Sequence, residues 1–189
     1  MSQSRIKSTA PPYTDEIQES FNVVMPPLNL FRAVGNNERV LSRTVRGGLL
    51  DKGSISIAQR ELVILRACAM CGAEYEWGVH VAGFAKKAGF SEDQIAATCS
   101  KSIDVSIWSE EQQMLLQLVD ELHVSSHLED ETWRELSKLF AGEQLIELIM
   151  LAGLYHAVSF VVNGLNIENE TSAPKFPRRT NTDDCAKHS

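Results

Sequence analysis

A helix over residues 57–71, IAQRELVILRACAMC, would be apolar on nearly every side. Ser56 and Gln59 form a capping-box pattern that predicts its first turn, and Gly72 is well placed to end it. A helix without a polar face needs neighbours all around it. The sequence therefore predicts that this helix lies at the centre of the domain.

Three charged residues, Arg60, Glu61 and Arg66, lie inside this expected central helix. A buried charge is tolerated only when it is paired or hydrogen-bonded. We therefore expect Arg60 or Arg66 to pair with Glu61 within the core.

The remaining apolar residues recur mostly at helical spacing, and no stretch alternates convincingly with the period of two that is typical of a strand. Glycine, proline, serine and asparagine mark the breaks between segments. The sequence predicts an all-α fold. The expected helices span residues 15–23, 28–35, 37–50, 57–71, 75–88, 92–100, 109–124, 130–140 and 143–164.

The chain of 189 residues has the length of one domain. Residues 1–14 and 168–189 are mostly polar and contain prolines, so we expect an N-terminal arm, a domain over residues 15–167 and a flexible C-terminal tail. The longest apolar run, LIMLAGLYHAVSFVV, is shorter than a membrane span, which predicts a buried helix.

The composition describes a globular protein with a formal net charge of −7 and 43% apolar residues. This charge argues against nucleic acid and anionic membranes as partners and favours small molecules and proteins. The first residues lack the apolar segment of a secretory signal, so we expect a cytoplasmic protein. Its four cysteines do not form the pattern of a disulfide framework, and we expect reduced thiols.

Two motifs compete for the chemistry within residues 68–80, CAMCGAEYEWGVH. The first is the C-x-x-C pair of Cys68 and Cys71. A redox pair needs a helix N-terminus to lower the thiol pKa, whereas these cysteines come at the end of the expected central helix. Two buried core thiols are the simpler interpretation.

The second motif is Glu76 followed four residues later by His80, which places both side chains on one helix face. A carboxylate beside a histidine sets its tautomer and moves its pKa within the range useful for proton transfer. A helix-stabilising surface pair is the alternative. Gly78, between them, indicates close approach of a neighbouring helix or a ligand.

These residues resemble the carboxymuconolactone decarboxylase superfamily, which also contains the AhpD-type alkylhydroperoxidases. The resemblance rests on RELVILRACAMCGAEYEWGVHVAGFAKKAGFSEDQIAA and continues over most of residues 28–167. It implies an AhpD-like helical domain with a central helical hairpin. It also implies a homo-oligomer, a trimer or hexamer and possibly a dimer.

In the peroxidases of this superfamily, a glutamate precedes a C-x-x-C whose second cysteine lies four residues before a histidine. Counting back from His80, the glutamate falls on Glu61 and the two cysteine positions fall on Ala73 and Glu76. The C-x-x-C of this chain lies five residues too early. A glutamate at the second cysteine position is similar to the decarboxylase branch.

The leading hypothesis is therefore lyase-type acid–base chemistry on a small carboxylate-bearing substrate, without a metal or organic cofactor. We expect His80 to supply a proton and Glu76 to orient the His80 ring. Glu61 would complete the proton relay, and Tyr75 would donate a hydrogen bond to an oxyanion. Arg60 and Tyr155 are the candidate substrate-binding residues, Tyr155 as part of a pocket wall.

Two other functions remain open. In the first, the protein is a thiol-dependent alkylhydroperoxidase that uses Cys68 and Cys71 from a non-standard place; Cys68 lies two helical turns after Glu61 and shares its face. In the second, it is a non-catalytic oligomeric binding protein that kept the fold.

Overall fold

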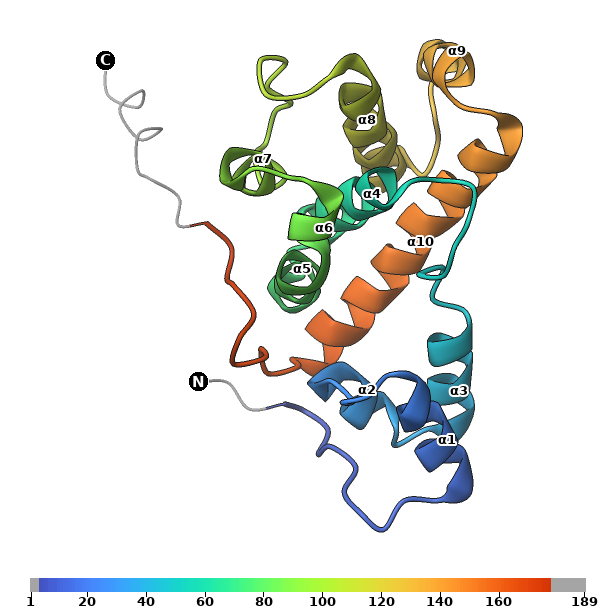
Figure 1. The fold of residues 1–189 in the computed structure, drawn as a ribbon, viewed down its shortest axis with the longest axis vertical. Helices are drawn as coiled ribbons and strands as arrows, with labels where there is room; N and C mark the ends of the chain where they lie inside the picture. Colours follow the sequence, from blue (N-terminus) through green and yellow to red (C-terminus); the bar gives the residue numbers. More distant parts are fainter. Residues whose placement is uncertain (1–3, 178–189) are drawn as a thin grey trace.

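The computed structural model describes residues 4–177, whose regular secondary structure is all helical, with no β-strand (Figure 1). The prediction of an all-α fold is confirmed. The elements are α1 (Asp15–Val23), α2 (Asn29–Val34), α3 (Glu38–Arg46), α4 (Ile57–Met70), α5 (Glu74–His80), η1 (Val81–Ala85), α6 (Lys86–Ala88), α7 (Glu92–Ala97), α8 (Glu110–Ser125), α9 (Asp130–Leu139) and α10 (Gly142–Leu165).

Helix α4 lies at the centre, packed against α5, α8 and α10. Its start has the expected capping box: the Gln59 backbone N–H donates to Ser56 Oγ at 3.1 Å, and the Gln59 side chain accepts from the Ser56 N–H at 2.8 Å. Gly72 turns the chain after the helix with a φ of +63°, a value that glycine adopts without strain. The turn folds α5 back against α4 and makes the expected hairpin.

The second arm of the hairpin differs from the single helix expected over residues 75–88. It begins as α5, widens into the π-helical turn η1 directly after His80, and returns to α-helical geometry in α6. A π-helical turn changes the angular position of the residues that follow it, and such turns are frequent at functional sites.

Helix α10 runs past α4 and α5 as the longest helix of the described chain (Figure 1). Its 24 residues extend one residue beyond each end of the helix expected over residues 143–164, and by length and composition alone it could cross a membrane. The expectation of a buried helix is met only in part, because 39% of its most apolar window is buried. One face packs into the core, while the apolar side chains of Ile146, Met150 and Phe160 are exposed. This exposed face suits the expected homo-oligomer, which stays a prediction.

The C-terminal segment, residues 168–177, packs against the domain, contrary to the expectation of a free tail. Its Glu170 carboxylate accepts hydrogen bonds from the Asn29 N–H at 2.6 Å and from the Tyr75 hydroxyl at 2.8 Å. The Phe176 N–H donates to Glu74 at 3.1 Å. The remainder of the expected tail lies outside the described residues.

Gly78 provides a test of this docked segment. A Cβ at residue 78 would overlap the backbone oxygen of Pro174, so Gly78 is approached by the C-terminal segment. We expect Gly78→Ala to lower the free energy of unfolding by about 1–3 kcal/mol and to speed proteolysis of residues 168–177. Gly83→Ala is the matched control, since a Cβ there meets open space. Equal urea-denaturation curves for wild type and Gly78→Ala would show that the segment does not dock.

Candidate active site

His80, at the end of α5, lies between side chains from three helices. Its Nδ1 is 2.7 Å from Glu61 Oε2 on α4. Its Nε2 is 3.0 Å from the Tyr155 hydroxyl on α10 and 3.5 Å from Glu76 Oε1, one turn earlier on α5. The structure thus brings Glu61, Glu76 and His80 together, with Tyr155 as a fourth member.

Arg60 also belongs to this cluster and binds the Glu61 carboxylate. Its Nε donates to Glu61 Oε1 at 2.9 Å, and its Nη1 donates to the Leu50 carbonyl at 2.7 Å. The Arg60 side chain is buried and does not line the neighbouring cavity. The expected pairing of Arg60 with Glu61 is therefore present. The candidate role of Arg60 in substrate binding finds no support, because its donors already hold protein groups.

His80 is almost fully buried, which by itself disfavours the imidazolium. Hydrogen bonds and charge attraction from Glu61 and Glu76 outweigh this effect and raise the pKa of His80 to about 9. The ring is therefore protonated at neutral pH. With His80 charged, two cations, Arg60 and His80, balance two carboxylates, Glu61 and Glu76, and the buried cluster is neutral overall.

Tyr155 completes the proton path toward the cavity. Burial raises the pKa of its hydroxyl well above the usual value, and the nearby Glu76 carboxylate raises it further. When His80 is an imidazolium, its Nε2–H donates to the Tyr155 oxygen. The Tyr155 hydrogen is then free to donate to a group in the cavity.

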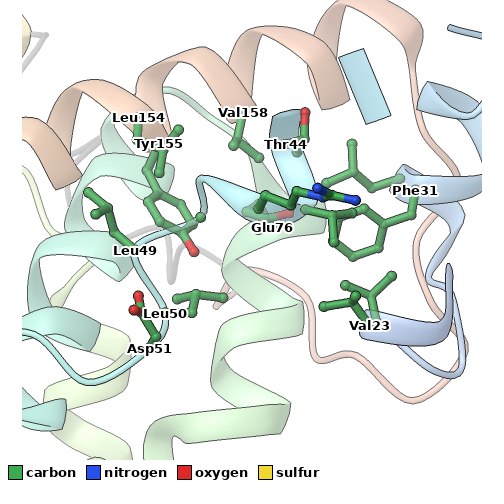
Figure 2. Close-up of a pocket in the computed structure, with 15 residues that line it drawn as sticks. Val23, Phe31, Thr44, Leu49, Leu50, Asp51, Glu76, Leu154, Tyr155 and Val158 are labelled. Carbon is green, nitrogen blue, oxygen red and sulfur yellow. The ribbon is translucent and has the colours of Figure 1, made fainter. Parts of the chain in front are cut away.

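The cavity beside this cluster has a volume of about 580 Å³. Figure 2 shows Glu76 and Tyr155 at its wall, together with Leu49, Leu50 and Asp51 from the loop after α3. Most of the lining is apolar. The apolar lining residues are Val23, Val24, Leu30, Phe31, Val45, Leu49, Leu50, Leu154 and Val158.

Arg46, at the end of α3, also lines the cavity and is exposed. It forms no ion pair with any residue between 4 and 177. An arginine without a carboxylate partner at the edge of an apolar cavity suits an anionic group of a ligand.

Solved structures with a similar fold come from several bacteria. An uncharacterized peroxidase-related protein from Silicibacter sp. TM1040 has a TM-score of 0.76 at 15% identity, over 92% of this chain and 95% of that one. An alkylhydroperoxidase AhpD core protein from Ralstonia eutropha JMP134 has a TM-score of 0.74 at 16% identity, over 93% and 100%. A debrominase in complex with 2,3,4-tribromopyrrole has a TM-score of 0.69 at 15% identity, over 90% and 94%. Among curated proteins, none matches the sequence significantly.

Residues 41–120 match the model of the carboxymuconolactone decarboxylase family, and this segment includes Glu61, Glu76 and His80. Over this segment the chain is similar to the carboxymuconolactone decarboxylase family. The matched segment contains the α4–α5 hairpin. The fourth site residue, Tyr155, lies outside the matched segment.

The structure does not support the role expected for Tyr75 in this carboxymuconolactone decarboxylase-like site. The Tyr75 hydroxyl accepts from the Leu30 N–H at 3.0 Å and donates to Glu170 at 2.8 Å, so its hydrogen is already used. Tyr75 is adjacent to Glu76 in sequence, but successive helical residues point in different directions. Tyr155 is the tyrosine that contacts His80.

The two thiols of the C-x-x-C motif also lie away from the cavity lining. Burial raises the pKa of the Cys68 thiol well above its usual value, and Glu76 raises it further. Burial also raises the pKa of Cys71. Neither sulfur has the low pKa that thiol attack on a hydroperoxide favours.

Sequence reasoning missed the cavity walls from α2 and the end of α3, and it recognised Tyr155 only as a possible wall residue. Helix α10 carries apolar residues on all its faces, so the spacing of these residues does not show which face packs against α5. The sequence therefore could not show that Tyr155 contacts His80. Arg39, Arg43 and Arg46 recur on one face of the helix expected over residues 37–50, and this repeat could have pointed to an anion-binding edge of the cavity. Only Arg46 lines the cavity.

The raised pKa of His80 predicts a pH dependence of stability. A group whose pKa is higher in the folded protein stabilises it fully below the unfolded pKa, near 6.5, and this contribution is lost as the pH rises through about 9. We expect the free energy of unfolding to fall by up to about 1.4 kcal/mol per pH unit between about pH 6.5 and 8.5. Urea titrations across this range measure it. Parallel pH profiles for wild type and His80→Gln would contradict the assignment.

Proposed function

We propose that this protein is an enzyme that transfers protons to a small, carboxylate-bearing organic substrate, with decarboxylation as the leading reaction. The observation that carries the proposal is the contact of His80 with Tyr155 and Glu76, both of which line an apolar cavity. A positioned acid of this kind is the main requirement for protonating a carbanion or an enolate.

In the proposed reaction the substrate carboxylate leaves as CO2, and the electron pair of the broken C–C bond passes into an adjacent unsaturated carbonyl system. The Tyr155 hydroxyl donates to the enolate oxygen that forms. A proton then moves to the substrate carbon by way of Tyr155 or Glu76, and His80 replaces it from Nε2. His80 regains a proton from water, so one proton is consumed for each CO2 released.

Two features of the cavity support a substrate of this class. The apolar walls suit a compact carbon skeleton, and Arg46 offers a cation to a carboxylate at the edge. The debrominase with a similar fold was solved with a small halogenated ring, 2,3,4-tribromopyrrole. A cavity of about 580 Å³ has room for a ring of that size with a carboxylate attached.

The thiol-dependent alkylhydroperoxidase is the alternative enzyme, and the positions and raised pKa values of Cys68 and Cys71 disfavour it. The non-catalytic binding protein is also disfavoured. A buried, charge-balanced acid–base cluster beside a cavity is costly to keep for packing alone.

The proposal is tested by supplying a panel of small carboxylated lactones, carboxymuconolactone among them, and measuring CO2 release and deuterium uptake from D2O into the product carbon. We expect Arg46→Gln to raise KM at least about tenfold, because one charge-assisted hydrogen bond is lost. Arg43→Gln, on the same helix but outside the cavity lining, is the matched control.

A second arm of the experiment addresses the thiols. The Cys68→Ser/Cys71→Ser double variant should release CO2 at the wild-type rate. If the reduced wild type consumes an organic hydroperoxide and the double variant does not, the proposal is wrong and the alkylhydroperoxidase function is supported. CO2 release without deuterium in the product would also contradict the proposal.

A further inference from the structure

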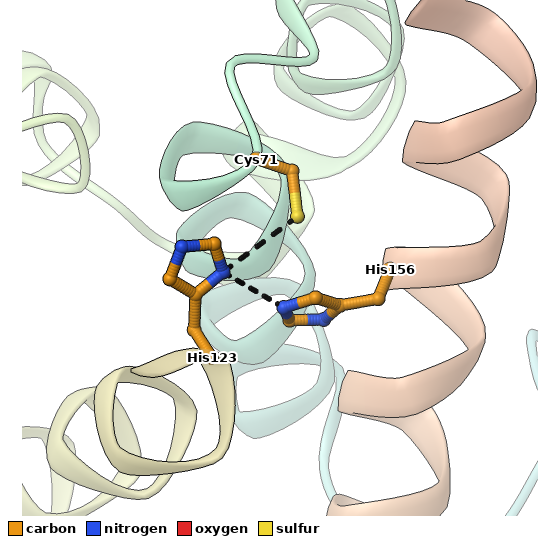
Figure 3. A group of neighbouring side chains, drawn as sticks. All are labelled: Cys71, His123 and His156. Carbon is orange, nitrogen blue, oxygen red and sulfur yellow. Dashed lines mark hydrogen bonds between the residues drawn. The ribbon is translucent and has the colours of Figure 1, made fainter. Parts of the chain in front are cut away.

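A second cluster of reactive side chains lies outside the proposed active site. Figure 3 shows Cys71, His123 and His156 pointing toward one another from three different helices. Cys71 is the C-terminal cap of α4, His123 lies in the last turn of α8, and His156 lies within α10. None of the three lines the cavity beside His80.

We propose that Cys71, His123 and His156 form a binding site for a divalent transition metal, with Zn²⁺ as the expected ion. The three ligand atoms all lie within 4.8 Å of one another. Cys71 Sγ is 3.9 Å from His123 Nδ1, and His123 Nδ1 is 2.9 Å from His156 Nε2.

These distances are close to those of a tetrahedral zinc site. With Zn–S near 2.3 Å and Zn–N near 2.0–2.1 Å, tetrahedral angles place sulfur and nitrogen about 3.6 Å apart and two nitrogens about 3.3 Å apart. The observed sulfur–nitrogen distance of 3.9 Å is longer than the tetrahedral value, and the observed nitrogen–nitrogen distance of 2.9 Å is shorter. Side-chain shifts of a few tenths of an ångström to about 1 Å bring the three atoms onto one ion.

The tautomer of His156 is already suited to a metal. Its Nδ1 is 2.8 Å from the Ala152 carbonyl, so Nδ1 carries the hydrogen and Nε2 directs a lone pair into the cluster. Metal-bound histidines typically donate their other ring N–H to a backbone carbonyl in this way. In the metal-free protein, His123 Nδ1–H donates to that lone pair.

His123 needs only a change of tautomer to bind a metal. A neutral His123 binds a metal through Nδ1 by moving its hydrogen to Nε2, without losing a proton.

The backbone around the cluster favours a cation. Cys71 and His123 lie at the C-terminal ends of α4 and α8, where the partial negative charge of the helix dipole is located. The end of α4 is held to α10 by the Asn163 side chain, which donates to the Cys71 carbonyl at 2.9 Å. Metal binding would release one proton, from the Cys71 thiol, and three protein ligands would leave a fourth position for water.

The choice of zinc follows from the ligands. One thiolate and two imidazoles form a borderline-soft set that suits Zn²⁺ in tetrahedral geometry and disfavours Mg²⁺ or Ca²⁺, which prefer oxygen. All three side chains are partly exposed, which gives the ion a path from solvent.

The test uses the full, reduced, metal-free chain with Co²⁺ as the spectroscopic probe and Zn²⁺ as the competitor. We expect one Co²⁺ per chain, a sulfur-to-cobalt charge-transfer band, the visible bands of tetrahedral Co²⁺, and loss of both when Zn²⁺ is added. Cys71→Ser and His156→Gln should each weaken Co²⁺ binding at least about 100-fold.

Matched controls separate this site from other thiols and histidines. Cys68→Ser removes the neighbouring buried thiol, and His127→Gln removes an exposed histidine near His123; both should leave Co²⁺ binding unchanged. Far-UV circular dichroism without metal checks that each variant folds. Absence of a charge-transfer band in the wild type, or equal affinity in wild type and both ligand variants, would overturn the proposal.

Discussion

Replacing His80 with glutamine is expected to lower kcat for CO2 release by about 10²- to 10⁴-fold, the usual contribution of a positioned general acid. Glutamine keeps a hydrogen-bonding side chain of similar length against Glu61, but it has no proton to transfer. KM should change little, because His80 contacts the cavity only through Tyr155 and Glu76. The measurement is steady-state CO2 release, together with deuterium uptake into the product carbon.

Two further variants sharpen this expectation. Tyr155→Phe removes the hydroxyl that receives the His80 proton and should also lower kcat, while His80 keeps its bond to Glu61. His127→Gln, at an exposed position, should keep wild-type activity. Wild-type kcat in His80→Gln would remove His80 from the proposed mechanism.

Glu61→Ala is expected to destabilise the protein by about 3–5 kcal/mol, the typical cost of breaking a buried ion pair from one side. Glu61 is 0% exposed and accepts hydrogen bonds from both Arg60 and His80. Its removal leaves the Arg60 guanidinium without its carboxylate inside the core. The measurement is urea denaturation at about pH 7, read as the change in free energy of unfolding.

The same variant should also change the titration of His80. Burial then acts on the ring without the hydrogen bond from Glu61, so the pKa of His80 falls. The decline of stability between about pH 6.5 and 8.5 should flatten accordingly. Glu135→Gln is the control, because Glu135 forms an exposed ion pair with Lys138, and such pairs contribute at most about 1 kcal/mol. Equal destabilisation by the two substitutions would contradict a buried cluster.

Much of the fold could be predicted because the helix signals are local. Two such signals are the capping box of Ser56 and Gln59 and the positive φ of Gly72. Both depend on residues within one or two turns, so they can be predicted from the sequence. The central position of α4 follows from its lack of a polar face. The π-helical turn after His80 had no such signal and was missed.

The candidate site could be predicted only where its residues belong to the α4–α5 hairpin. Glu61, Glu76 and His80 meet because a tight turn folds two adjacent helices together, and the resemblance to a known family supplied their register. Tyr75 was expected to act in catalysis and Tyr155 only to line the pocket, whereas the hydroxyl that contacts His80 belongs to Tyr155, 75 positions further along the chain. Their roles in catalysis stay predictions.

The sequence by itself determined an all-α chain, a buried central helix and the pairing of Glu61 with one arginine of that helix, because periodicity, caps and the cost of burying a charge act on residues close in the chain. Packing decided that Arg60 takes this role and that Arg66 pairs with Asp120. Tertiary packing decided the cavity, the docking of residues 168–177 on α5 and the meeting of Cys71, His123 and His156. These features join residues from helices far apart in sequence. Their contacts depend on how whole helices pack against one another, and no local pattern encodes that arrangement.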